Sequence, residues 1–257
     1  MDKLIYTALS ATESASVHRI MLTNDLANIS TNGFKRGSFQ RAVSAKLEGP
    51  GFATRYQPIV PTRTDIVNMT EGPRIQTDNP LDVAMNDQTV LGVFSDDGQL
   101  AFTRRGDLRV SEAGFLQTAN GFLVSTEDGG PLTVPVGGTV SVTPDGTIFF
   151  NQTQVANPPV PPQQIGQLLL RDASATVLQR RTDGLFEDSN AGGVGGDITP
   201  GPGIPSITSG ALEGSNVNPV EVLVNLMDFY RSFETQMKVI KSTEELDKDG
   251  TRLMRAS

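Results

Sequence analysis

The chain has 257 residues, with 21 basic and 29 acidic side chains and a formal net charge of −8 at pH 7. No run of basic residues interrupts this acidic background. Counterion release therefore cannot drive nucleic-acid binding, and we expect no DNA or RNA partner. The chain contains no cysteine, which excludes disulfides, thiol catalysis and thiolate metal sites. No apolar stretch approaches the roughly 20 residues of a membrane-spanning helix, and polar residues from Thr7 onward interrupt any secretory signal.

A heptad pattern near the N-terminus predicts a helix from about Asp2 to Ser30. Its stripe recurs at alternating spacings of three and four and is interrupted by Thr12 and Arg19. The apolar and small members of the stripe are Ile5, Ala8, Ala15, Leu22, Leu26 and Ile29. Gly33 follows Asn32, and a glycine there is typical of the left-handed position that ends a helix. One side of this helix is therefore expected to pack against a partner helix.

The middle of the chain is expected to be extended and then rich in strands. Residues 34–77 contain four prolines, which exclude a long helix, although Tyr56, Ile59 and Val60 suit short strands. From residue 81 to about 186 the pattern predicts β-structure. Its hairpin turn signals are Asp97-Gly98, Asn120-Gly121, Asp128-Gly129 and Asp145-Gly146. Residues 151–164 are expected to form a loop, and residues 189–205, rich in glycine and proline, a linker.

A second heptad pattern predicts a C-terminal helix that runs to about Leu246 or as far as Arg255. Asn218 is a good N-cap, Pro219 suits the first helical position, and Glu221 completes a capping box. The stripe of this helix consists of Leu223, Leu226, Tyr230, Phe233, Met237 and Ile240. We take both stripes as candidate assembly interfaces.

These elements predict an α+β fold, in which the N- and C-terminal helices form an inner coiled-coil or bundle layer and the central part of the chain forms a mainly-β domain outside it. The expected parts are an N-terminal helix (1–33), an extended connector (34–77), a β-rich domain (78–205), and a C-terminal linker and helix (206–257). Two helices packed only on each other are marginally stable, because ordering the backbone costs more than one stripe of buried apolar side chains returns. We therefore hypothesise that the terminal segments become helical on assembly and are largely unfolded before it.

The sequence contains few residues that could form a catalytic or metal-binding site. His18 is the single histidine, which leaves no Ser-His-Asp triad and no zinc site with two histidines. Adjacent carboxylates such as Asp96 and Asp97 lie beside glycine, as in a solvated turn. Residues 247–250 resemble the start of a calcium loop but lack its later ligands, and residues 192–196 match no phosphate-binding loop. We expect no catalytic residue, metal or cofactor, and no enzyme activity.

Four segments of the chain carry recognisable short motifs: Asn24 to Arg36, Asn79 to Met85, Phe102 to Leu108 and Gly210 to Val217. Together they resemble the flagellar rod and hook protein family. Asn24 to Arg36 resembles the family's N-terminal signature, Asn79 to Met85 the entry to its β domain, and Phe102 to Leu108 its F/Y-T-R-x-G segment. Gly210 to Val217 is similar to the G-x-L-E-x-S-N-V segment before its C-terminal helix. The motif positions taken as candidate sites are Asn24, Leu26, Ala27, Asn28, Gly33, Phe34, Leu212, Glu213, Ser215, Asn216 and Val217. The strand over residues 89–94 departs from the family pattern, which leaves its register open.

The resemblance implies a structural subunit of the bacterial flagellar basal-body rod, which crosses the periplasmic space and transmits torque. It implies assembly with other copies of the chain and other rod proteins, and export by the flagellar type III apparatus. The segment from Arg231 to Ile240 looks more like the proximal than the distal rod proteins. A distal rod protein is the alternative within the family. A β-rich periplasmic enzyme or binding module is the alternative from another class.

Overall fold

The computed structural model describes residues 2–38, 45–49, 52–56, 65–152, 161–189 and 195–255. The chain divides into two compact units. Unit 1 contains residues 1–27, 39–63 and 218–257, and unit 2 contains residues 28–38 and 64–217. Unit 1 holds both helices, whereas the described part of unit 2 is built from strands and loops. The mainly-β architecture with two terminal helices agrees with the α+β class expected from the sequence.

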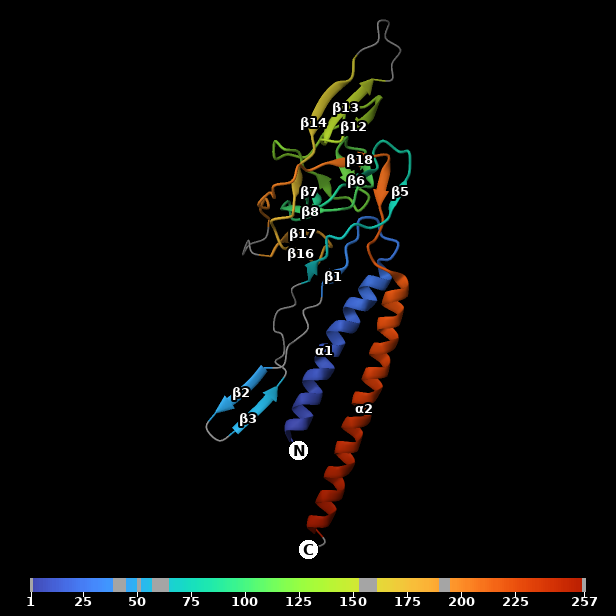
Figure 1. Ribbon diagram of the computed structural model, residues 1–257. Helices are drawn as coiled ribbons and strands as arrows, with labels where there is room; N and C mark the ends of the chain where they lie inside the picture. The colour runs from blue at the N-terminus through green and yellow to red at the C-terminus, as the bar shows by residue number, and fades with distance from the viewer. Residues whose placement is uncertain are drawn as a thin grey trace. The chain divides into compact units, whose positions relative to one another are not determined.

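In unit 1, helix α1 (Asp2–Ala27) lies beside helix α2 (Pro219–Arg255), and the two contact each other (Figure 1). The predicted N-cap is confirmed: Oδ1 of Asn218 accepts hydrogen bonds from the N–H groups of Val220 (3.0 Å) and Glu221 (3.3 Å). Helix α2 continues past Leu246 through Gly250, so the residues that resemble a calcium loop are helical. None of the described helices combines the length and hydropathy needed to cross a bilayer.

Unit 1 also contains a hairpin of two antiparallel strands, β2 (Ala45–Gly49) and β3 (Phe52–Tyr56). Tyr56 is therefore in a strand, as expected, whereas Ile59 and Val60 lie outside the described residues.

The N-terminal helix differs from its prediction at its C-terminal end. Helix α1 ends at Ala27, before Ser30, and turns follow it. Gly33 does have a left-handed φ of 69°, but it lies well beyond the last helical residue. The assignment of Gly33 as the glycine that ends the helix is therefore wrong.

Unit 2 is organised around one large antiparallel sheet (Figure 1). Its strand order among the described residues is β1 (Gly37–Ser38), β4 (Ile66–Val67), β16 (Leu178–Arg180), β17 (Phe186–Asp188), β8 (Leu100–Thr103), β7 (Thr89–Phe94), β11 (Leu123–Val124), β10 (Leu116–Thr118) and β9 (Leu108–Val110). Strand β15 (Leu170–Asp172) also pairs with β7. A second sheet consists of β12 (Gly138–Val142), β13 (Thr147–Gln152) and β14 (Gln163–Gln167).

Two short ribbons complete unit 2. Strand β18 (Ile207–Ser209) pairs with β6 (Val83–Met85), and β19 (Ala211–Glu213) pairs with β5 (Arg74–Gln76). The predicted division placed residues 206–217 with the C-terminal helix, whereas in the structure they contain β18 and β19 and belong to unit 2. Strands of three residues are too short for their alternation to be visible in the sequence, and their partners are remote along the chain.

The predicted tight turns are present. Gly98, Gly121, Gly129 and Gly146 have positive φ values of 72°, 98°, 83° and 83°. Around Gly146 the register of β12 and β13 places Val140 opposite Phe150 and Val142 opposite Ile148. These hairpins are set by local sequence, because a glycine adopts the required backbone conformation without a steric penalty.

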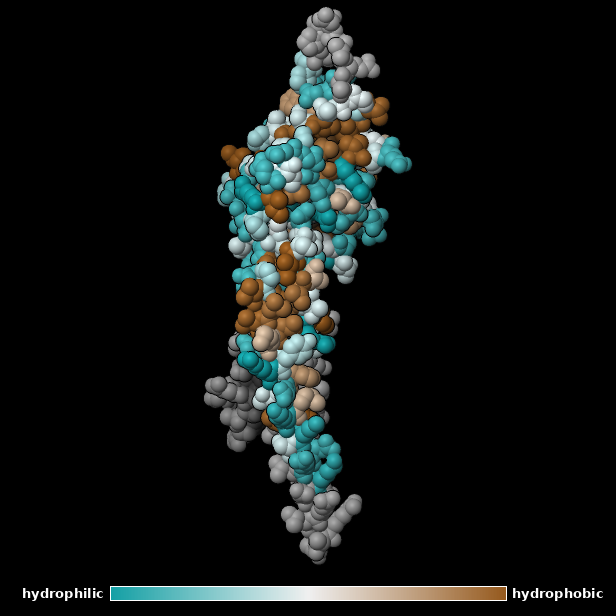
Figure 2. All heavy atoms as spheres, turned by 90° about the vertical axis from the view of Figure 1, so that its right-hand side faces the viewer, coloured by the Kyte–Doolittle hydropathy of each residue, from teal (hydrophilic) through white to brown (hydrophobic). Residues whose placement is uncertain are grey.

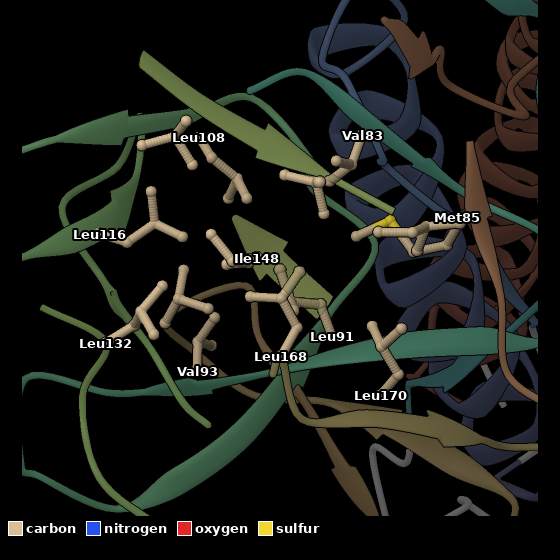
Figure 3. Close-up of a cluster of buried hydrophobic side chains, with 14 of the residues drawn as sticks. Val83, Met85, Leu91, Val93, Leu108, Leu116, Leu132, Ile148, Leu168 and Leu170 are labelled. Carbon is tan, nitrogen blue, oxygen red and sulfur yellow. The ribbon is translucent and has the colours of Figure 1, made fainter. Parts of the chain in front are cut away.

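Strand β7 lies at the centre of the core and is buried on both faces. On one face, Leu91 and Val93 join the larger hydrophobic cluster (Figure 3). On the other face, Val90 joins a second cluster with Phe102 and Leu169. Burial on two faces requires a continuous apolar run, which explains why residues 89–94 show no alternation. The register left open by the sequence pairs Leu91 with Thr103 and Val93 with Ala101.

Candidate functional site: a buried ionic clasp and an uncovered helix face

The carboxylate of Glu213 is the centre of a buried ionic network in unit 2. Its Oε1 accepts hydrogen bonds from Nζ of Lys35 (2.5 Å) and the N–H of Gly72 (2.9 Å). Its Oε2 accepts from Nε of Arg104 (2.8 Å) and lies 2.6 Å from Nη2 of the same residue. Glu213, Lys35 and Arg104 are all buried, so the carboxylate attracts both cations at short range in a place that water does not reach.

Arg104 fastens this network to the sheet. Besides its two contacts with Glu213, its guanidinium donates to the backbone oxygens of Asp87 (2.6 Å), Thr89 (3.0 Å) and Met85 (3.1 Å). These hydrogen bonds use four of its five N–H groups, and Nη2 also lies within ion-pair distance of Glu213. The buried guanidinium therefore holds the segment from β6 to β7 against Glu213.

Lys35 adds a second cation to the same carboxylate. Its Nζ donates to Glu213 and to the carbonyl oxygen of Thr70 (2.8 Å). Burial, followed by repulsion from Arg104, lowers the pKa of Lys35 to about 8, although Glu213 opposes the shift. The network therefore loses a positive charge when the pH rises through this value.

Gly33 brings the chain that leaves α1 against the same network. Its N–H donates to the backbone oxygen of Glu213 (2.7 Å). A Cβ atom at Gly33 would lie 2.3 Å from the carbonyl oxygen of Arg104, which is closer than any real contact. The positive φ and this close approach together explain why position 33 must be glycine.

Asn216 links the outgoing chain to two other segments. Its Oδ1 accepts from the N–H of Arg36 (2.6 Å), and its Nδ2 donates to the backbone oxygens of Asn68 (2.9 Å) and Thr70 (3.1 Å). Lys35, Arg104, Glu213 and Asn216 will be called the clasp. The family motifs supplied all four of these residues, yet sequence reasoning assigned no contact among them.

Arg180 supports the clasp from strand β16 and was missed by the sequence reasoning. Its guanidinium carbon lies 4.4 Å from the ring centroid of Phe34, a cation–π distance. It also donates from Nη2 to the carbonyl oxygen of Lys35 and pairs with Asp65 (3.5 Å). No local sequence signal distinguishes Arg180 from the neighbouring Arg181, so only the fold reveals its role.

The remaining motif residues support the same region. Leu212, Ser215 and Val217 are buried around the clasp segment of the chain. Asn24 and Ala27 are exposed on the last turns of α1, Leu26 is half-buried there, and half-buried Asn28 accepts a hydrogen bond from Thr31 (3.1 Å). The motifs at the two ends of unit 2 therefore meet in space, whereas the motif on α1 belongs to unit 1.

The predicted stripe on α1 is partly covered. Leu22 is buried, and Ala15, Leu26 and Ile29 are half-buried, Ile29 lying just beyond the helix. Arg19, which interrupts the stripe, is exposed. The side chains of Ile5 and Ala8 lie outside the described residues.

The predicted stripe on α2 divides between two faces. Leu226 and Ile240 are half-buried and share a face with Val222, which is fully buried, and with half-buried Phe229. Leu223 and Tyr230 are about half exposed, and Phe233 and Met237 are 37% and 38% exposed. The less exposed positions mark the side that packs on α1.

A second apolar face therefore stays uncovered on α2. It consists of Val220, Leu223, Val224 and Met227, each at least 50% exposed. Figure 2 shows a brown, hydrophobic patch over the first turns of this helix. A cluster of large apolar side chains on a water-exposed helix is typical of a protein–protein interface. Among the described residues, no group of three or more His, Asp or Glu side chains is placed to hold a metal.

Comparison with known proteins agrees with the motifs. Residues 208–253 match the family described as the C-terminal part of flagellar basal body rod FlgEFG proteins, and residues 85–150 match the D1 domain of flagellar hook protein FlgE/F/G. The chain is 36% identical to the flagellar basal-body rod protein FlgF of Salmonella typhimurium over 258 residues, which cover 100% of both chains. The chain belongs to the flagellar basal-body rod protein family.

Other relatives support the same assignment. The FlgF of Escherichia coli is 35% identical over 95% of both chains. The FlgG of Buchnera aphidicola from Acyrthosiphon pisum is 27% identical over 94% of this chain and 96% of its own. Rod proteins of this family are structural proteins and not enzymes. This chain is accordingly a structural rod subunit of the flagellar basal body, which spans the periplasm, and the motif residues of the clasp serve its architecture.

Proposed function

We propose that this chain is a subunit of the proximal rod, and that its terminal helices pack with helices of neighbouring rod subunits in a bundle or coiled-coil layer. The observation that carries the proposal is the uncovered apolar face of α2. Helix α1 leaves Val220, Leu223, Val224 and Met227 exposed, and a helix of a neighbouring subunit would bury them. Repeated contact between two different patches builds a helical assembly, such as a rod.

The proposal includes the other stripe residues as assembly positions. Tyr230, Phe233 and Met237 are partly exposed and extend the apolar surface along α2. Leu226, Ile240, Ala15 and Ile29 are half-buried, so a neighbouring helix would complete their burial. Many such contacts acting in parallel would transmit torque along the rod. The terminal segments would be ordered fully only when the neighbours are in place, because helix formation depends on tertiary packing.

The proximal position is supported by the pattern of similarity. The FlgF proteins match at 35–36% identity, whereas the FlgG of Buchnera matches at 27%. A distal position is the alternative. We further propose that the chain reaches the rod through the flagellar type III export apparatus, as its resemblance to the family implies.

Charge insertion on α2 tests the assembly surface. Met227→Glu places a charge in the uncovered face, whereas Ser232→Glu places the same charge at an exposed polar position of the same helix. In cells that lack the native chain, we expect Met227→Glu to abolish swimming and incorporation into isolated basal bodies, and Ser232→Glu to preserve both. Normal incorporation of Met227→Glu would contradict the proposed interface.

A single-cysteine label tests the position. The chain has no native cysteine, and Val136 is 93% exposed, so Val136→Cys offers one reactive thiol. We expect gold attached to this residue in purified basal bodies to lie at the end of the rod nearer the inner membrane. Gold at the end nearer the hook would establish the distal alternative.

A further inference from the structure

We infer that the clasp is the mechanical joint through which force passes between the helical unit and the β unit. The inference rests on the proposed function, because only a subunit of a rotating rod carries such force. It begins from the connectivity of the chain. The polypeptide passes between the two units at four places, after residues 27, 38, 63 and 217.

All four passages lie close in sequence to the clasp or to its partners. Gly33 to Arg36 lies between the first passage and the second, Asp65 to Gly72 follows the third, and Glu213 to Asn216 precedes the fourth. A force applied to either helix or to the connector therefore enters unit 2 within a few residues of the clasp or of its partners.

Asn216 joins the passages to one another. Its side chain binds the backbone of Arg36, Asn68 and Thr70, and its own N–H donates to the carbonyl oxygen of Phe34 (3.3 Å). A single side chain thus connects the segments next to the second, third and fourth passages. Tension in one of these segments is shared with the others before any strand is displaced.

Glu213 then fixes the joined segments to the core. It binds Lys35 and Gly72 with one oxygen and Arg104 with the other. Arg104 in turn holds the backbone oxygens of Met85, Asp87 and Thr89 between β6 and β7. Strand β7 is the most deeply buried strand of the sheet, so force that reaches Arg104 is delivered to the interior of unit 2.

The strands at these passages are too short to resist force without the clasp. Strand β1 has two residues, paired as Gly37 with Val67 and Ser38 with Ile66. Strand β19 has three residues and pairs only with the three of β5 among the described strands. Such short pairings would peel away one hydrogen bond at a time. The buried charges must separate together, which makes the joint resist as a unit.

Single-molecule pulling on the full-length chain tests this inference. The chain has no cysteine, so handles are attached at Thr23→Cys on α1 and at Met227→Cys on α2. In the parent chain we expect unit 2 to unfold in one step. In Glu213→Gln and Asn216→Ala we expect an earlier step, as residues 28–38 and 211–217 peel off. This step releases about 60 Å, because an extended residue spans about 3.5 Å.

Two matched variants serve as controls. Glu127→Gln removes a carboxylate that pairs with Arg171 at the surface, and Asn151→Ala removes an amide that contacts Ser141. Both should unfold as the parent does. At a fixed force, the first step of the clasp variants should occur at least about tenfold faster than the single step of the controls, a difference equal to about 1.4 kcal/mol.

The outcomes separate this inference from the proposed function. An early step in Asn216→Ala supports the inference even where Glu213→Gln fails to fold. Absence of an early step in Asn216→Ala, with a rupture force equal to that of Asn151→Ala, overturns it. The assay uses the isolated chain, so failure of rod assembly in cells would leave this result unchanged and would count against the proposed function alone.

Discussion

Lys35 and Glu213 are 178 positions apart in the sequence, yet Nζ of Lys35 lies 2.5 Å from Oε1 of Glu213 with both side chains buried. This ion pair closes unit 2, because it connects the first segment of the unit with the last. Arg104 shares the same carboxylate, so one anion faces two cations and the three groups keep a net charge of +1 while Lys35 is protonated. Removing that anion leaves two buried positive charges without compensation, which is far more costly than removing a surface charge.

Glu213→Gln should therefore destabilise unit 2 strongly. We expect a loss of about 3–5 kcal/mol in the free energy of unfolding. In Glu127→Gln, which breaks a partly exposed pair with Arg171, the loss should be at most about 1 kcal/mol. Urea titrations followed by far-UV circular dichroism would measure both. Equal midpoints for the two variants would show that the buried carboxylate of Glu213 contributes no more to stability than the partly exposed carboxylate of Glu127.

The shifted pKa of Lys35 predicts a stability that depends on pH. In the folded chain the pKa is about 8, below the ordinary value of 10.5 that applies to the unfolded chain. Between these values the unfolded chain binds more protons, so the free energy of unfolding should rise with pH from 8 to 10.5. Below pH 8 both states are protonated, and the full cost of burying the charge remains.

The size of this rise follows from the shift. Each pKa unit corresponds to about 1.4 kcal/mol, so the total gain is about 3 kcal/mol. Lys35→Met should lack this contribution, while the other titrating groups act on both proteins alike. The measurement is the difference in unfolding free energy between parent and variant across pH 7–11. A difference that does not change with pH would refute the titration of Lys35.

The local features of this fold could be predicted from the sequence, because their signals lie within a few residues. The Asn218 cap and the hairpin at Asp145-Gly146 follow from side-chain and backbone chemistry at adjacent positions. The clasp could not be predicted in the same way. Arg104 and Glu213 are 109 positions apart, and Lys35 and Glu213 are 178 positions apart. No periodicity in the sequence connects them.

One error of interpretation has a physical cause. A positive-φ glycine after a helix serves both as a helix end and as a point of close approach, and the sequence around Gly33 does not distinguish these roles. On α2, two heptad registers share Leu226 and Phe233. The register with Leu223 stays a predicted assembly stripe, whereas no feature of the sequence indicated that the register with buried Val222 packs on α1.

Gly33→Ala tests the close approach at the clasp. Gly33 and Gly98 have nearly the same positive φ, 69° and 72°, but a Cβ at Gly98 would meet no atom within 4 Å. Gly98→Ala should cost about 1–2 kcal/mol of stability from backbone conformation alone. Gly33→Ala should cost a further 1–3 kcal/mol or so, because its Cβ would collide with the carbonyl of Arg104. Thermal unfolding of the two variants gives the comparison, and equal losses would exclude the steric role.

The cap of α2 provides a test in the helical unit. Asn218→Ala removes the side-chain oxygen that accepts from Val220 and Glu221, and should cost about 1 kcal/mol of helix stability. Asn225→Ala makes the same substitution inside the helix, where alanine has the better helix propensity, and should be neutral or slightly stabilising. The helical signal at 222 nm on heating would separate the two variants.

Because the uncovered apolar face begins at Val220, fraying of this end should also reduce incorporation into the rod. Unchanged incorporation of Asn218→Ala at a clearly reduced helical stability would show that the first turn of α2 is not part of the assembly surface.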